Sequence, residues 1–283
     1  MSKTRWKAFP HASSDFDYKG PALAKAWARL HQGDCEPFPD AKTLEAQAKA
    51  HPRLKPKGSF DDAAATVQDA WRAYHRGDFG GAVELGLSVG LLGYNVANKA
   101  TNIYASYLEA SDSAKLALLQ ESASRAEELI GAAKSLANAW YLHAHALGRY
   151  SQGISIGKAL AEGLAGKVRN SLEQAISLAP KHADAHIALG TYHAEIINKV
   201  GGMIGGLTYG ASKDAGVKHF ETALKLNPTS AVARTEFGAG LIMMFGNSKM
   251  KDALKLYEQA ASCEPKDAME CLDVEAAKEE LED

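Results

Sequence analysis

The chain has few of the residues that build disulfide frameworks, nucleic-acid interfaces or membrane spans. Its three cysteines, Cys35, Cys263 and Cys271, are too few and too scattered for a disulfide scaffold or a zinc site, so we expect reduced thiols. The formal net charge of -2 provides no general attraction for nucleic acid or for an anionic membrane. No apolar run reaches the length of about 18 residues that a transmembrane helix needs, and the nearest, residues 81–97, contains Glu84. We therefore expect neither a nucleic-acid partner nor a membrane span.

Signals for export and for known catalytic chemistry are also missing. The N-terminal sequence MSKTRWKAFPHASSDF lacks the apolar segment of a secretory signal, which predicts a cytoplasmic protein. There is no GxSxG, no HExxH, no phosphate-binding glycine loop and no nucleophile with an identifiable base. Ten histidines occur, and His182 and His186 share a predicted helix, but no set of ligands converges as zinc requires. We predict that the chain is not an enzyme and binds no metal or cofactor.

What the chain does contain is an internal repeat. Three segments share one pattern: LEQAISLAP at 172–180, FETALKLNP at 220–228 and YEQAASCEP at 257–265. Each begins with a bulky apolar residue, has an alanine one helical turn later and ends in proline. On a helix the bulky residue and the alanine lie on one face, and the proline ends the helix. Each segment therefore predicts the end of one helix and the turn into the next, and the repetition predicts a stack of helices.

The residues after each proline match one another as well. Leu-Gly at 189–190 and Phe-Gly at 237–238 hold equivalent positions, and Leu-Gly at 147–148 is a third copy. Together these segments resemble the tetratricopeptide repeat (TPR), a pair of antiparallel helices of about 34 residues. The prolines here are 48 and 37 residues apart, because extra residues fall between the two helices of a unit. The resemblance implies an all-α, right-handed helical solenoid of antiparallel helix pairs, with inserted loops and a C-terminal capping helix.

Residues 137–283 carry a narrower resemblance. The long units, the sequence YGAS at 209–212 and the extended C-terminal helix are similar to the TRAP-transporter T-component proteins and to the regulator-of-microtubule-dynamics proteins, which share divergent TPR-like repeats. This resemblance implies an alternative function, a carrier with an apolar cavity for a small molecule. A metal-dependent enzyme of unrecognised type is a further, less favoured alternative.

The composition divides the chain near residue 60. Residues 1–60 form an arm with short predicted helices at 22–31 and 41–50, and its aromatic side chains predict that it docks on the solenoid. These aromatic residues are Trp6, Phe9, Phe16, Tyr18, Trp27 and Phe38. Residues 61–283 form the predicted TPR-like α-solenoid. Its expected helices span 61–76, 79–95, 97–109, 113–135, 137–152, 155–179, 183–198, 213–226, 230–245, 248–263 and 267–281.

Charge is distributed unevenly between the ends of the chain. Residues 1–60 hold eleven Lys or Arg and six Asp or Glu, whereas residues 266–283 hold two Lys and eight acidic residues. A solvated arm and a polar final helix explain this distribution. Head-to-tail attraction between copies is the alternative, and it would produce a homo-oligomer.

In TPR proteins the first helices of successive units line a concave groove that accepts a peptide or another ligand. By register, the groove of this chain would present Trp71, His75, His145, Arg149, Thr191, Glu195, Thr235 and Met243. TPR proteins that grip a C-terminal carboxylate use Asn, Lys and Arg in the groove, and only Arg149 is available here. We therefore predict a non-catalytic scaffold that binds a peptide or protein partner in a groove of mixed polarity.

The longest insertion, residues 198–216, is both glycine-rich and apolar. Met203, Ile204, Leu207 and Tyr209 make this segment costly to leave in water. Two interpretations stay open. The segment is either a loop folded onto the stack, or a lid that covers a small apolar ligand or touches a partner.

Overall fold

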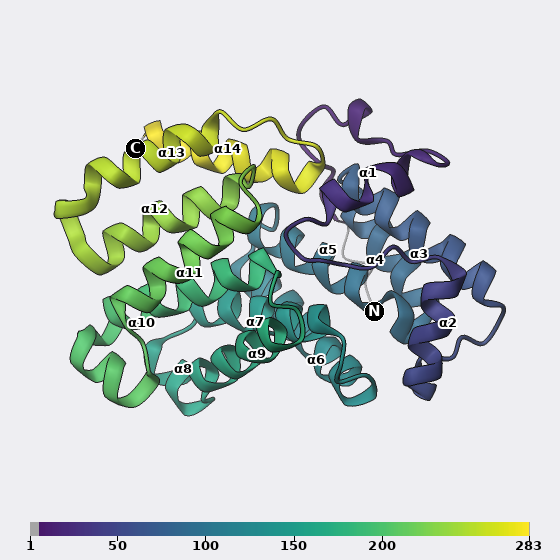
Figure 1. Ribbon diagram of the computed structural model, residues 1–283, viewed down its shortest axis with the longest axis horizontal. Coiled ribbons are helices and arrows are strands. Elements are labelled where there is room, and N and C mark those ends of the chain that lie inside the picture. Colours follow the sequence, from purple (N-terminus) through teal and green to yellow (C-terminus); the bar gives the residue numbers. More distant parts are fainter. Residues whose placement is uncertain (1–5, 283) are drawn as a thin grey trace.

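A computed structural model describes residues 6–282, and every regular element in this range is helical (Figure 1). The α-helices, in chain order, are α1 (Ala22–Leu30), α2 (Ala41–Ala50), α3 (Phe60–His75), α4 (Phe79–Ser88), α5 (Tyr94–Tyr107), α6 (Asp112–Ala132), α7 (Ala137–Gln152), α8 (Ile156–Ala161), α9 (Leu164–Leu178), α10 (Ala183–Tyr209), α11 (Lys213–Leu226), α12 (Ala231–Phe245), α13 (Met250–Ala261) and α14 (Ala268–Glu282). Short 3-10 helices lie at Ser14–Phe16, Pro52–Leu54, Gly90–Gly93 and Gly246–Lys249. Within residues 6–282, no helix combines the length and apolar character required to cross a bilayer.

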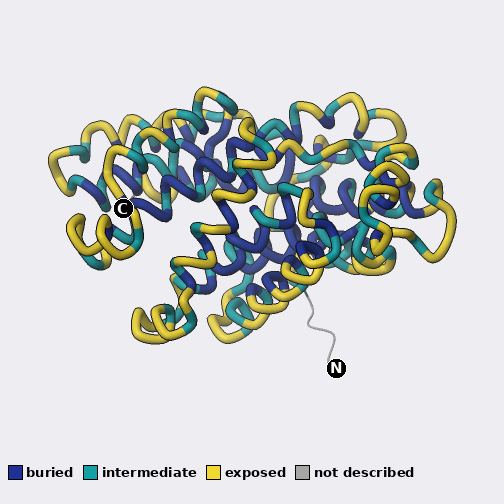
Figure 2. Tube along the Cα trace, turned by 60° about the horizontal axis from the view of Figure 1, so that its bottom comes forward, coloured by how far each residue is buried: buried dark blue, intermediate teal, exposed yellow. Residues whose placement is uncertain are grey.

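The helices pack as successive pairs. The pairs are α3 with α4, α5 with α6, α7 with α9, α10 with α11 and α12 with α13, and α14 closes the stack against α12 and α13. Neighbouring pairs join through α5 with α7, α9 with α10, and α10 with α12. The buried residues follow the facing sides of the helices, whereas the turns at the edge of the stack are exposed (Figure 2). The prediction of an all-α helical solenoid is confirmed.

The repeated sequence pattern describes how the two helices of a pair meet. The residues that open the three repeated segments are all buried: Leu172, Phe220 and Tyr257. A Cβ atom at Gly190 on α10 would lie 2.9 Å from the ring of Phe220 on α11. A Cβ atom at Gly238 on α12 would lie 2.6 Å from the ring of Tyr257 on α13. The glycine on the first helix therefore makes room for the bulky residue of the second helix, because a side chain there would collide with it.

Serine and aspartate side chains set where several helices begin. Ser59, Ser111, Ser212 and Ser230 each accept a hydrogen bond from a backbone N–H in the first turn of α3, α6, α11 and α12. Asp78 does the same at the start of α4. Such caps satisfy a backbone donor that has no partner within its own helix, and each contributes about 1 kcal/mol to stability.

Three expected helices differ from the structure at glycines. The helix expected at 79–95 is interrupted by the 3-10 turn at Gly90–Gly93, where Gly90 has φ of 65°. The helix expected at 155–179 is split into α8 and α9 by Gly163, at φ of 64°. The insertion expected as a loop at 198–216 is helical instead, because α10 continues to Tyr209 across a kink at Gly201, at φ of 79°. Glycine enters these left-handed conformations without the steric cost that other residues meet.

The N-terminal segment packs along the helical stack. Leu23 and Trp27 of α1 belong to the same buried cluster as Trp71 and Tyr74 of α3, and the Trp27 and Trp71 ring centroids lie 5.7 Å apart. On its other side, Arg29 of α1 forms two hydrogen bonds with Glu270 of α14, at 2.6 and 3.1 Å. Figure 1 shows α1 between α3 and α14. The arm thus connects the first helix pair to the last helix of the chain.

Candidate functional site

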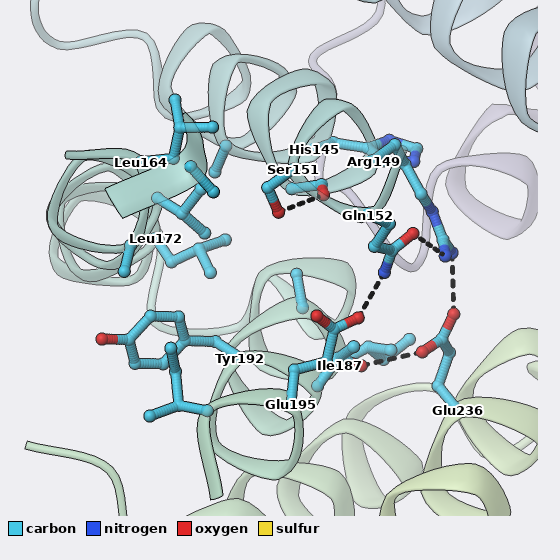
Figure 3. Close-up of a pocket in the computed structure, with 18 of the residues that line it drawn as sticks. His145, Arg149, Ser151, Gln152, Leu164, Leu172, Ile187, Tyr192, Glu195 and Glu236 are labelled. Carbon is cyan, nitrogen blue, oxygen red and sulfur yellow. Dashed lines mark hydrogen bonds and ion pairs between the residues drawn. The ribbon is translucent and has the colours of Figure 1, made fainter. Parts of the chain in front are cut away.

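A cavity of about 360 Å³ lies in the C-terminal half of the chain. Helices α7, α9 and α10 form most of its wall, α8 lies at its edge, and α5, α12 and α14 contribute at one end (Figure 3). This volume is at the lower end of the range of small-molecule sites.

The repeat pattern explains why the cavity is there. In the α10–α11 and α12–α13 pairs, an aromatic ring fills the space above a glycine. The equivalent residues of the α7–α9 pair are Gly148 and Leu172, and both line the cavity. No atom of a neighbouring element lies within 4 Å of the Cβ position at Gly148. A leucine side chain is shorter than an aromatic ring and leaves this space unfilled.

One side of the cavity is apolar. Leu164, Val168 and Leu172 of α9 face Ile187 and Tyr192 of α10 across the space (Figure 3). These side chains are buried in the protein. At the edge, Ile156 and Leu160 of α8 also line the cavity while remaining 54% and 51% exposed. Helix α8 therefore separates the apolar wall from solvent.

The opposite side carries a chain of hydrogen bonds that joins three helices. Arg149 of α7 donates from Nη2 to Oε1 of Glu236 on α12, at 2.7 Å, and from Nη1 to Oε1 of Gln152, at 3.2 Å. Oε2 of Glu236 accepts from the Thr191 hydroxyl of α10, at 2.9 Å. Glu236 raises the pKa of Arg149 above its usual range, so the guanidinium stays charged.

The same chain continues along α10. Gln152 donates from Nε2 to Oε1 of Glu195, at 2.5 Å, and Lys199 donates from Nζ to Oε2 of Glu195, at 2.7 Å. Figure 3 shows Arg149, Gln152, Glu195 and Glu236 pointing toward one another from different helices. Each of the two cations that line the cavity, Arg149 and Lys199, therefore has its own carboxylate.

Two further carboxylates line the cavity without a cationic partner on its wall. Asp273 of α14 is 5% exposed and accepts from the Tyr107 hydroxyl at 2.6 Å. Burial is the main cause that raises the pKa of Asp273 to about 8. Burial likewise raises the pKa of Asp184, in the first turn of α10, to about 6.

A neutral histidine lies on the same wall. Burial, followed by the charge of Arg149, lowers the pKa of His145 to about 3, so its imidazole is uncharged near neutral pH. The Nδ1 atom of His145 is buried and has no hydrogen-bond partner among residues 6–282. It is therefore available to a bound molecule.

Half of the residues predicted for the groove come together at this cavity. His145, Arg149, Thr191 and Glu195 all line it. Glu236, which pairs with Arg149, was missed by one position, since the register named its neighbour Thr235. The only signal for Glu236 was its place on the first helix of a repeat. Asp184 and Asp273 gave no signal of their own.

The other predicted groove residues do not reach the cavity. Thr235 donates to the Ala231 carbonyl oxygen of its own helix, at 3.3 Å, and Met243 packs against the cluster around Phe220. The prediction that Trp71 and His75 present a groove surface is wrong, because they are only 2% and 1% exposed. The Nδ1 atom of His75 instead forms a hydrogen bond with Oδ2 of Asp267, at 2.8 Å.

The N-terminal arm covers the face where Trp71 and His75 lie. His31 stacks on Trp27 with ring centroids 3.9 Å apart and meets Trp71 edge-on at 4.6 Å. Beyond this aromatic cluster, Asp34 pairs with Lys99 of α5, and both are buried. The arm therefore fills the inner surface of the first helix pairs with its own side chains.

The residues predicted as a lid behave in two ways. Tyr209 lines the cavity, and its carbonyl oxygen accepts from Arg169 Nη1 and from the Tyr192 hydroxyl, each at 3.0 Å. Met203, Ile204 and Leu207 do not line the cavity and are 78%, 53% and 85% exposed. Among residues 6–282, no group of three or more potential metal ligands is present.

Comparisons with known proteins agree with the helical architecture. No protein-family model matches the chain, and no curated protein matches it. Among solved structures, the chain is similar to TTC0263, a thermophilic TPR protein of Thermus thermophilus, with 14% identity and a TM-score of 0.54 over 76% of this chain and 98% of that one. It is also similar to the MamA protein, with 15% identity and a TM-score of 0.40 over 70% of this chain and 89% of that one. A third is YrrB, a TPR protein with an unusual peptide-binding site, with 15% identity and a TM-score of 0.40 over 84% of this chain and 99% of that one. The repeated sequence, the paired helices and the likeness to TTC0263 establish that this chain has a divergent TPR-like fold.

Proposed function

We propose that the chain is a non-catalytic binding protein whose cavity holds a small, mainly apolar molecule with one polar end. The observation that carries the proposal is the two-sided wall, which is aliphatic along α8, α9 and α10 and hydrogen-bonded along α7, α10 and α12. Apolar atoms of a ligand gain free energy by leaving water for the aliphatic side. Polar groups on the other side orient the ligand, as in other small-molecule sites.

The arrangement of the first helix pairs supports a small molecule over a long peptide. Trp71 and His75 lie beneath the arm, and Asp34 of the arm reaches Lys99 on α5. The space that stays open on the inner side is the cavity between α7, α9 and α10. A side-chain-sized or slightly larger molecule fits this volume.

The partners of the lining groups support a binding role over a catalytic one. An activated nucleophile needs a base within hydrogen-bond reach. The Ser151 hydroxyl instead donates to the Gly148 carbonyl oxygen of its own helix, at 2.7 Å, and the Thr191 hydroxyl donates to Glu236. Arg149 and Lys199 are each held by a carboxylate.

The protein supplies its own design for a test. Leu172→Phe places a ring where Phe220 and Tyr257 place theirs, and this ring would fill the cavity above Gly148. The control is Leu178→Phe on the same helix, where the side chain is 42% exposed. Native mass spectrometry of the purified full chain, together with binding of an apolar fluorescent probe, reports occupancy. We expect Leu172→Phe to lose the adduct and the probe signal, and Leu178→Phe to keep both. Equal binding by both variants would place the ligand elsewhere.

A second candidate function, binding of an extended peptide, is favoured by how the arm itself is held. Side chains of the stack donate to backbone carbonyl oxygens of the arm: Asn138 to Asp34 at 3.0 Å, Gln68 to Pro39 at 3.1 Å, and Arg72 to Tyr18 and Gly20 at 3.0 Å each. A partner peptide could use the same donors if it displaced the arm.

A synthetic peptide with the sequence of residues 14–40 tests this second candidate. In the full chain, Trp27→Ala removes the arm's central contact with Trp71 while leaving Gln68, Arg72 and Asn138 in place. We expect the labelled peptide to bind this variant and not the unmodified chain. If the variant retains its helicity but does not bind the peptide, the inner face does not accept an extended partner.

A further inference from the structure

We propose that the molecule held in the cavity carries a positively charged group, of the primary-amine class, which docks against Asp184 and Asp273. This inference rests on the proposed function, because it specifies the chemistry of the ligand. It follows from the charges on the cavity wall, from the hydrogen bonds that they already make and from the donors that a cation would supply.

The charges on the wall do not balance. The lining residues include two cations, Arg149 and Lys199. They also include four carboxylates, Glu195, Glu236, Asp184 and Asp273. Arg149 pairs with Glu236 at 2.7 Å and Lys199 pairs with Glu195 at 2.7 Å, so these four charges cancel. Asp184 and Asp273 are left over.

Asp273 has hydrogen-bonding capacity that the protein does not use. Its Oδ1 atom accepts from the Tyr107 hydroxyl, and no donor from residues 6–282 reaches its Oδ2 atom. A carboxylate of this kind can accept further hydrogen bonds. The side chain is buried, so the cavity is the place from which another donor can reach it.

Asp184 is in a similar situation on the facing helix. Its backbone N–H donates to the Gly33 carbonyl oxygen at 3.0 Å, but no donor among residues 6–282 reaches its carboxylate. The nearest buried cation, Lys99, is already held by Asp34. A cation from outside the protein would therefore meet a carboxylate without a competing partner.

The unpartnered Nδ1 atom of His145 adds a third group at this end of the cavity. An uncharged imidazole nitrogen without a proton accepts a hydrogen bond, and an ammonium group offers three donors and no acceptor. The donors of an ammonium match these acceptors. A carboxylate ligand would instead add a negative charge next to Asp184 and Asp273, which is unfavourable in a site with little water.

The titration of the two carboxyl groups agrees with this assignment. Burial is the first cause of the raised pKa of Asp273, and Asp267 and Glu270 of α14 and Asp184 of α10 raise it further, while the Tyr107 hydrogen bond on α5 lowers it. Without ligand, this end of the cavity therefore retains a proton near neutral pH. A bound cation lowers the pKa of both carboxyl groups, so binding releases protons and strengthens as pH rises.

Three probes with the same alkyl chain and different head groups test the inference on the full chain. Octylammonium, octanol and octanoate fit the apolar side equally, and their affinities are compared by calorimetry at pH 8. We expect octylammonium to bind about tenfold or more tightly than octanol, as a charge-assisted hydrogen bond provides, and octanoate to bind most weakly. Repeating the titration in buffers of different ionisation enthalpy should show proton release with octylammonium and none with octanol.

Two isosteric variants assign the preference to the named residues. Asp184→Asn and Asp273→Asn should each reduce the preference for octylammonium over octanol and leave octanol binding unchanged. Glu258→Gln, on the exposed side of α13, is the matched control and should change neither affinity. Circular dichroism checks that each variant is folded.

The outcomes separate this inference from the proposed function. If octanol and octylammonium bind equally, or octanoate binds best, the cation assignment is wrong while the cavity remains a binding site. If both Asp variants keep the full preference, the cation docks elsewhere and the assignment is also wrong. If none of the three probes binds, both the proposed function and the inference fail.

Discussion

Arg149 and Glu236 form an ion pair between the first helices of two different repeat units, with Nη2 of Arg149 2.7 Å from Oε1 of Glu236. The side chains are 31% and 18% exposed, so the pair is partly shielded from water and its charges interact more strongly than exposed charges would. Thr191 of the intervening helix α10 donates to the same carboxylate. This pair links α7 to α12 across the polar side of the cavity and holds that side in place.

Removing the cation of this pair should destabilise the protein. Arg149→Met keeps much of the side-chain volume but leaves Glu236 partly buried with Thr191 alone, so we expect the free energy of unfolding to fall by about 1–3 kcal/mol. The double variant Arg149→Met with Glu236→Gln should lose less than the sum of the single variants, because no unpaired charge remains. Urea denaturation measures all three. Lys249→Met is the control, since its pair with Asp252 is 45% and 57% exposed and should contribute less than about 1 kcal/mol. Strict additivity of the two changes would show that the residues do not act as a pair.

The glycines of the repeat should respond differently to substitution by alanine. At Gly238 the added Cβ would lie 2.6 Å from the Tyr257 ring, so we expect Gly238→Ala to cost about 1–3 kcal/mol through overpacking. At Gly148 no atom of a neighbouring element lies within 4 Å, so Gly148→Ala should stabilise α7 by about 0.5–1 kcal/mol. Thermal unfolding followed by circular dichroism compares the two. A stabilising Gly238→Ala would contradict the account of how paired helices meet.

Asp273 should make stability depend on pH. Its pKa in the folded protein is about 8, above its ordinary value of 3.8, so the folded state binds a proton more tightly than the unfolded state does. The resulting stabilisation is complete below pH 3.8 and is lost as pH rises toward 8. Asp273→Asn removes this dependence. The free energy of unfolding of Asp273→Asn relative to the unmodified chain should therefore increase steadily from pH 4 to pH 8.

Chemical denaturation at several pH values measures this difference, and Glu221→Gln on the exposed side of α11 is the control. Comparing variant and unmodified chain also removes the opposite contribution of buried histidines such as His182, whose pKa burial lowers to about 4. A relative stability that falls with rising pH would mean that Asp273 is ionised in the folded protein.

The arm should be separable from the rest of the chain by one substitution. Trp27 is 6% exposed and packs against Trp71, His31 and Phe38, so Trp27→Ala should cost about 3–5 kcal/mol at that contact. If the arm docks as a unit on an independently stable solenoid, limited proteolysis should then cut within residues 6–58 while the helical signal of the remainder is kept. Global loss of helicity would instead show that the arm is part of one cooperative core.

The sequence alone was enough to predict the elements and their mode of packing, because both depend on short spacings along the chain. Alanine one turn after a bulky residue, followed by proline, predicts a helix face and a helix end whatever lies around them. The ends of α7 at Gln152 and of α11 at Leu226 match the predicted helices at 137–152 and 213–226. The same register brought His145 and Arg149 to the correct wall of the cavity.

Only the tertiary structure decided what the inner surface offers. Neighbouring residues of a helix point about 100° apart, so an error of one position exchanged Glu236, which reaches the cavity, for Thr235, which does not. The arm covers Trp71 and His75 through contacts between residues far apart in the chain, for which no local pattern exists. The cavity itself arises because Leu172 is smaller than the rings of Phe220 and Tyr257, and a void between helices is a property of three-dimensional packing that no single segment encodes.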